Sequence, residues 1–76
     1  AYNNMVCELA IKFPAINQKE MLYCGFVLLD IPQNHAMVLL GTTPNGLYKI
    51  RQRLAQKLEL SSTRELDDFL KNTYGQ

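Results

Sequence analysis

The segment DIPQNHAMVLLGTTPNG, at residues 30–46, contains two helix start signals and one helix stop signal. Pro32 is favoured in the first turn of a helix, and Gly41 can end that helix in the left-handed conformation. Thr43 can then cap a second helix whose first residue is Pro44. Because so few residues separate the stop from the second start, the segment predicts a short helix, a tight turn and another helix.

The chain before this segment carries the pattern of two further helices. Apolar residues recur at helical spacing over residues 3–12, which predicts an amphipathic helix ended by Pro14. Asn17 and Glu20 have the spacing of a capping box, which would open a second helix over residues 18–29. This second helix is apolar almost all round, so we expect it at the centre of the fold. A buried strand over GFVLLDI is an alternative that periodicity alone does not exclude.

The longest predicted helix covers residues 44–58 and has two distinct faces. At about 100° per residue, one narrow stripe is apolar and the opposite face is polar. The apolar stripe consists of Leu47, Ile50, Leu54 and Leu58. The polar face consists of Asn45, Lys49, Gln52, Arg53 and Gln56, with Tyr48 at its edge. Ser62 and Glu65 have capping-box spacing and predict a last helix that runs to about Tyr74.

These patterns predict an all-α fold, a helix-turn-helix bundle of four helices plus an additional N-terminal helix. Residues 16–76 would form the bundle, and residues 1–15 would be an extension of it or a link to a preceding domain. The 76 residues suffice for one domain with a modest core. Because the chain starts at Ala1 without a Met, we expect it to be part of a larger protein.

Basic residues are concentrated on the longest predicted helix. The net charge of the chain is only +1, but residues 31–58 contain no acidic residue and carry a charge of +4. The four cations of this stretch are Lys49, Arg51, Arg53 and Lys57. Such a local basic patch favours a polyanionic partner. Arg51 lies beside the apolar stripe, so we expect it to form an ion pair with the acidic last helix or to snorkel rather than contact a base.

Composition argues against several other classes of protein. Cys7 and Cys24 form no metal-binding pattern with the single His, and we expect both to be buried thiols in a reducing compartment. No pairing of nucleophile and base predicts an enzyme, and Asp67 and Asp68 are expected to be solvated. No metal or cofactor site is expected. The longest apolar run is too short for a membrane span and no signal peptide is visible, so a soluble, cytoplasmic segment without membrane contact is predicted.

From Ile16 to about residue 72, the order of motifs resembles the LuxR/GerE-type helix-turn-helix domain of bacterial transcriptional regulators. The segments that carry the resemblance are INQKEMLYC, TPNGLYKIRQRLAQKL and SSTREL. The chain departs from the family pattern at NHAM in the short helix and at Gly46, Ile50 and Glu59. Glu59 replaces a Gly that would favour the left-handed geometry at the helix end. Close packing is the expected reason for Gly46, ahead of close approach to DNA.

The resemblance implies sequence-specific binding of double-stranded DNA, with the helix over residues 44–58 in the major groove and the full-length protein acting as a homodimer. It implies no small-molecule substrate for this domain. The base-facing candidates are Asn45, Tyr48, Lys49, Gln52, Arg53 and Gln56. The phosphate-contact candidates are Gln33, Thr43 and Lys57, the first two through helix N-termini. His35 is equally compatible with a phosphate contact and with a solvated surface. The alternative is a helical protein-interaction or dimerisation module with the same fold.

Overall fold

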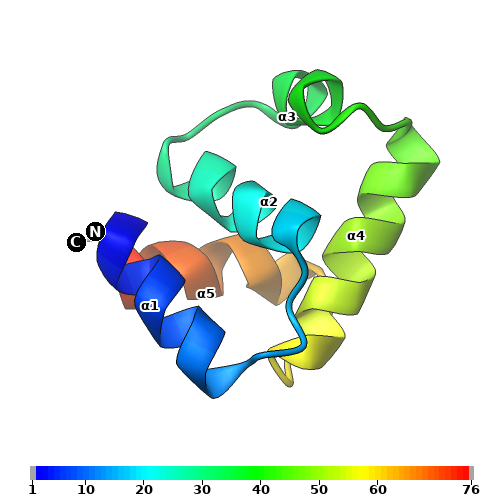
Figure 1. The fold of residues 1–76 in the computed structure, drawn as a ribbon. Coiled ribbons are helices and arrows are strands. Elements are labelled where there is room, and N and C mark those ends of the chain that lie inside the picture. The colour runs from blue at the N-terminus through cyan, green and yellow to red at the C-terminus, as the bar shows by residue number, and fades with distance from the viewer. Residues whose placement is uncertain (1, 76) are drawn as a thin grey trace.

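Five α-helices make up the computed structural model, which describes residues 2–75 (Figure 1). In chain order they are α1 (Tyr2–Lys12), α2 (Gln18–Leu28), α3 (Gln33–Leu40), α4 (Pro44–Lys57) and α5 (Arg64–Tyr74). The described part of the chain contains no strand, so the alternative of a strand in the α2 region is wrong. The expectation of an all-α bundle is confirmed.

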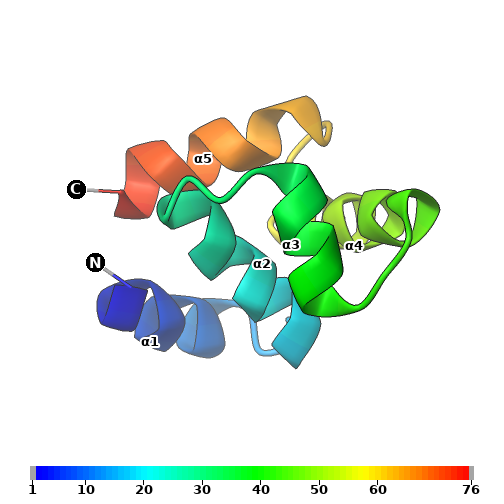
Figure 2. The same ribbon diagram turned by 90° about the horizontal axis from the view of Figure 1, so that it is seen from above.

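Helix α2 lies at the centre of the fold, as its apolar sequence predicted. It contacts all four other helices, and Figure 2 shows it between α1, α3 and α5. The capping box at its start is formed in both directions. The Asn17 side chain accepts a hydrogen bond from the Glu20 N–H, and the Glu20 carboxylate accepts one from the Asn17 N–H, each at 2.9 Å. These two bonds satisfy amides that the first turn of a helix otherwise leaves unpaired.

The start and stop signals around the α3–α4 turn act as predicted. Gly41 ends α3 in the left-handed conformation, with φ 65° and ψ 40°. The Thr43 hydroxyl caps α4 by accepting a hydrogen bond from the Gly46 N–H at 3.1 Å, and Pro44 begins the helix. In Figure 1, α3 is seen almost end-on at the top while α4 descends along the right edge, so the two helices cross. The segment therefore forms a helix-turn-helix.

One apolar core joins all five helices. Its buried members are Met5, Leu9, Tyr23, Cys24, Val27, Leu40, Leu47, Leu54, Leu58, Leu66, Leu70 and Tyr74. The apolar stripe predicted for α4 faces this core, with Ile50 as its half-buried member. Helices α1 and α5 lie side by side, and the start of α1 and the end of α5 lie on the side of the molecule away from α4 (Figures 1 and 2).

The predicted capping box of Ser62 and Glu65 does not form. Thr63 is the residue before α5 and already has helical dihedral angles, and its side chain makes no capping hydrogen bond. The Glu65 carboxylate instead reaches back to Ser61, accepting from its N–H at 3.0 Å and from its hydroxyl at 2.6 Å. Because Thr63 has already entered the helical conformation, the carboxylate meets the residue four positions back instead of three.

The two cysteines differ in burial. Cys24 is buried as predicted, but Cys7 is exposed, so that expectation is wrong for Cys7. Met5 and Leu9 of the same helix are fully buried. Cys7 is two residues from each of them, which places it about 200° around the helix, on the opposite side.

Glu59, just after α4, has a φ of 61°. A left-handed conformation is unfavourable for a residue with a Cβ, and Gly relieves this cost. We therefore expect Glu59→Gly to raise the free energy of unfolding by about 1 kcal/mol and the Tm by about 5 °C. Thermal unfolding of both proteins measures the shift. Glu59→Ala is the matched control, since it removes the charge and keeps the strain; an equal gain from this control would contradict the backbone explanation.

Candidate nucleic-acid interface

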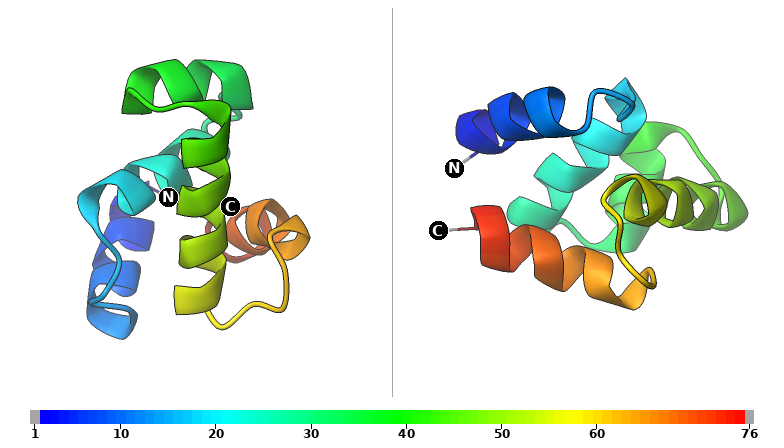
Figure 3. Two further views of the ribbon diagram at one scale, coloured as in Figure 1. Left: turned by 90° about the vertical axis from the view of Figure 1, so that its right-hand side faces the viewer. Right: turned by 90° about the horizontal axis from the view of Figure 1, so that it is seen from below.

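The outer face of α4 brings together all six base-facing candidates. Asn45, Tyr48, Lys49, Gln52, Arg53 and Gln56 are all exposed. Their spacing of three and four residues places them along one side of the helix, opposite the buried stripe. The left view of Figure 3 shows α4 in front of the rest of the fold, with no helix covering it on this side. This open face is called the reading face below.

The electrostatics of the reading face suit a polyanion. Helix α4 contains no acidic residue, and the acidic residues nearest in sequence are Asp30 and Glu59. Lys49 and Arg53 are one turn apart, and within residues 2–75 neither has an acidic partner within 4.0 Å. Their charges are therefore not neutralised by an ion pair with another described residue.

The phosphate-contact candidates Gln33 and Thr43 lie at the N-termini of α3 and α4. Gln33 is exposed and is the first residue of α3. Pro32 precedes it and offers no side-chain acceptor, so no side chain within the described range caps α3. At α4 the Thr43 hydroxyl already accepts a hydrogen bond from the Gly46 N–H. The first-turn amides of α3 are therefore the more open of the two sets for an anion.

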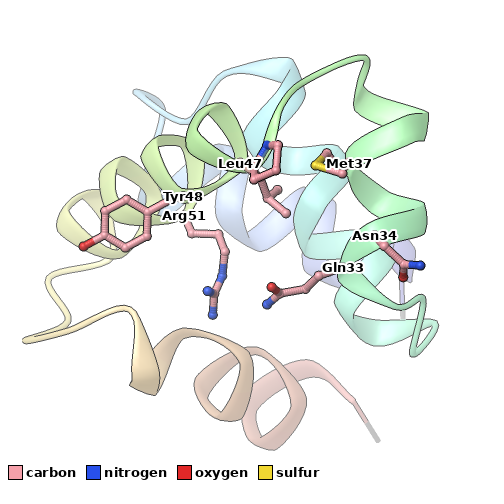
Figure 4. Close-up of a pocket in the computed structure, with 7 residues that line it drawn as sticks. Gln33, Asn34, Met37, Leu47, Tyr48 and Arg51 are labelled. Carbon is pink, nitrogen blue, oxygen red and sulfur yellow. The ribbon is translucent and has the colours of Figure 1, made fainter.

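A hollow of about 300 Å³ lies between α3 and the first turns of α4 (Figure 4). Met37 and Leu47 contribute apolar surface to it, and Gln33, Tyr48 and Arg51 contribute polar groups. Asn34 and Pro44 complete the lining. The hollow thus joins a base-facing candidate, Tyr48, to a phosphate-contact candidate, Gln33. Sequence reasoning did not anticipate it, because it depends on the packing of two helices.

Lys57 does not lie on the reading face, in contrast to its prediction as a phosphate contact. Its ammonium is 2.6 Å from the Glu20 Oε1 atom and donates a hydrogen bond to the Ala15 carbonyl at 2.9 Å. Glu20 is only 1% exposed. A buried carboxylate requires a partner, and Lys57 supplies it. We therefore assign Lys57 to this internal ion pair. Glu20 within the largely apolar α2 was the sequence signal that could have indicated such a partner.

Arg51 also turns away from the reading face. Its Nη2 atom is 3.7 Å from the Asp67 Oδ1 atom and donates a hydrogen bond to the Thr63 carbonyl at 3.3 Å. The guanidinium carbon lies 6.0 Å from the centre of the Tyr23 ring. The ion pair with the acidic last helix was one of the two expectations for Arg51, and it is confirmed.

Asp67 is not merely solvated, and that expectation is wrong. It is partly buried, and its Oδ1 atom accepts a hydrogen bond from the Tyr23 hydroxyl at 2.9 Å. Burial, and next the negative charge of Asp67, raise the pKa of Tyr23 well above its usual value. Asp68 is exposed as expected. The difference arises because the two residues point to different sides of α5, and only one side faces Tyr23 and Arg51.

Two smaller expectations concern Gly46 and His35. A Cβ at Gly46 would collide with the Thr42 hydroxyl oxygen and lie 3.3 Å from that of Thr43. Gly46 therefore packs closely against the α3–α4 turn, and not against the preceding helix as expected from the sequence. His35 is exposed.

Comparison of the chain with protein-family models, curated proteins and solved structures found no match. Over the described residues, no group of three or more His, Cys, Asp or Glu side chains is placed to hold a metal ion. No helix in the same range is both long enough and apolar enough to cross a membrane.

Proposed function

We propose that this chain is a sequence-specific DNA-binding domain with α4 as its recognition helix in the major groove. The observation that carries the proposal is the reading face, an open helix surface with six polar or aromatic side chains and no carboxylate. By the motif resemblance, the domain would be the C-terminal effector part of a bacterial transcriptional regulator and would act as a homodimer.

The side chains of the reading face match the chemistry of base edges and phosphates. Asn and Gln can bond adenine in a bidentate manner, and Arg and Lys can bond guanine or a phosphate. Asn45, Gln52 and Gln56 would carry the first kind of contact, and Lys49 and Arg53 the second. The uncapped start of α3 at Gln33 would meet a backbone phosphate.

We expect DNA affinity to fall steeply with salt. If Lys49 and Arg53 neutralise two phosphates, the affinity should fall roughly tenfold between about 50 and 200 mM salt. Lys49→Ala removes one of these cations and should weaken binding and reduce the logarithmic salt slope by about one. Fluorescence anisotropy with a random-sequence duplex pool measures both effects. The exposed Lys19, at the start of α2, provides the control Lys19→Ala, which removes the same charge and should keep the slope.

We expect Gln52→Ala to relax sequence preference rather than abolish binding. One lost bidentate base contact corresponds to about 1–3 kcal/mol of discrimination at one base pair. Selection of duplexes from a random pool by the original chain and by the variant reveals the change as one degenerate position. A folded chain that binds no DNA at low salt, even with two copies joined by a flexible linker, would refute the proposed function.

A protein-interaction module is the second candidate, and exposed apolar side chains favour it. Ile11 of α1 is 80% exposed, and Val38 and Leu39 of α3 are 73% and 62% exposed. Binding to DNA that ignores sequence, together with a tight protein complex insensitive to Lys49→Ala and Arg53→Ala, would support this candidate over the first.

A further inference from the structure

The first turns of α4 are incompletely supported on the side of α3. The hollow of about 300 Å³ separates these turns from α3. On the α3 side it is lined by Gln33, Asn34 and Met37. Close packing is what normally holds one helix at a defined angle to another. The part of the reading face that includes Asn45, Tyr48 and Lys49 therefore depends on Leu47, which is buried in the core, and on contacts made further along α4.

Arg51 provides such a contact on the inner side of α4. It lines the hollow and is three residues from Tyr48 and two from Lys49. Figure 4 shows its side chain extending from α4 toward α5. There the Nη2 atom meets the Asp67 carboxylate and the Thr63 carbonyl. One side chain thus connects α4 to α5 and to the residue that precedes α5.

The Asp67 carboxylate that faces Arg51 is also fixed by a hydrogen bond. The Tyr23 hydroxyl of α2 donates a hydrogen bond to the same Asp67 oxygen that faces Arg51. The Arg51 Nε atom is buried and has no hydrogen-bond partner within the described residues, so Nη2 makes the polar contacts. Beside the packing of its apolar stripe in the core, the middle of α4 is therefore linked to α2 and α5 by a polar contact at the Asp67 carboxylate.

We infer that Arg51 is a positioning residue, which sets the orientation of the reading face through Asp67 and Tyr23 and thereby contributes to base discrimination without contacting DNA. The inference rests on the proposed function. A phosphate contact acts on all sequences alike and contributes to the salt slope, whereas a positioning residue acts on sequence preference.

The test compares Arg51→Met and Asp67→Asn with the original chain. Met keeps an apolar stem and removes the donors, and Asn keeps an oxygen that the Tyr23 hydroxyl can use. The probes are a duplex selected from a random pool by the original chain and a scrambled duplex of equal length. Leu9→Val, a change in the fully buried part of α1, controls for lost stability, and circular dichroism checks that each variant is folded.

The preference of Arg51→Met for the selected duplex should be about tenfold lower than that of the original chain, with an unchanged salt slope. Asp67→Asn should shift the preference in the same direction, and Leu9→Val should keep it. If the original chain selects a duplex and both folded variants keep its preference, the inference is wrong and the proposed function stands. Equal weakening on both duplexes, with a slope reduced by about one, would make Arg51 a phosphate contact and also overturn it. If the original chain selects no duplex, the proposed function fails and the inference fails with it.

Discussion

Lys57→Met should lower the free energy of unfolding by about 2–3 kcal/mol, because it leaves a buried carboxylate without its cation. Glu20 is 1% exposed, and Lys57 lies 2.6 Å from it while remaining partly open to solvent. Removing one partner of a buried pair costs about 3–5 kcal/mol, and the partial exposure of Lys57 lowers this value. In a domain of this size the loss is a large part of the total stability.

Urea denaturation at neutral pH measures this effect. Lys49→Met is the matched control, since it removes the same charge from the exposed face of the same helix and should change stability by less than about 0.5 kcal/mol. Adding Glu20→Gln to Lys57→Met should restore part of the loss, because the uncompensated charge is then absent. If Lys57→Met and Lys49→Met unfold at the same urea concentration, the ion pair does not stabilise the fold.

Alkaline pH should destabilise the domain by about 2 kcal/mol between pH 7 and pH 10 through Cys24 and Tyr23. Burial, followed by the charge of Glu20, raises the pKa of Cys24 from 9.0 to about 12. The pKa of Tyr23 is also raised from 10.0, chiefly by burial. In the unfolded chain these groups lose their protons first, so rising pH favours the unfolded state. The stability is fully present below about pH 8, begins to fall near the unfolded pKa of Cys24, and continues to fall through the raised pKa values.

Chemical denaturation at pH 7, 9 and 10 under reducing conditions tests this dependence. Cys24→Ala should lower stability at pH 7 and should remove more than half of the decline, because the thiol accounts for most of the stability lost up to pH 10. Cys7→Ala should retain the original pH dependence, since that side chain is exposed. A decline as steep in Cys24→Ala as in the original chain would show that other groups cause it.

Local sequence signals predicted most helix boundaries because their contacts span only a few residues. Asn17 bonds to Glu20, and Thr43 bonds to Gly46, each three positions away. The exposure of the six reading-face residues also followed from helical periodicity alone. The last helix is the exception, since the choice between Ser61 and Ser62 as the partner of Glu65 depended on the conformation of Thr63.

The sequence by itself determined the helix-turn-helix and the side of α4 that faces solvent, since periodicity and capping act within one or two turns. It left open a strand in the α2 region, which the structure of residues 2–75 excludes. Only the tertiary structure decided that Lys57 turns to a buried carboxylate and which acidic residue of the last helix Arg51 meets. Lys49 and Arg53 stay on the reading face, whereas Lys57 pairs with Glu20, 37 positions earlier, and Arg51 joins the contact that links Tyr23 to Asp67, 44 positions apart. The physical reason is that a buried carboxylate takes whichever cation the fold brings near it, and no local pattern encodes that distance.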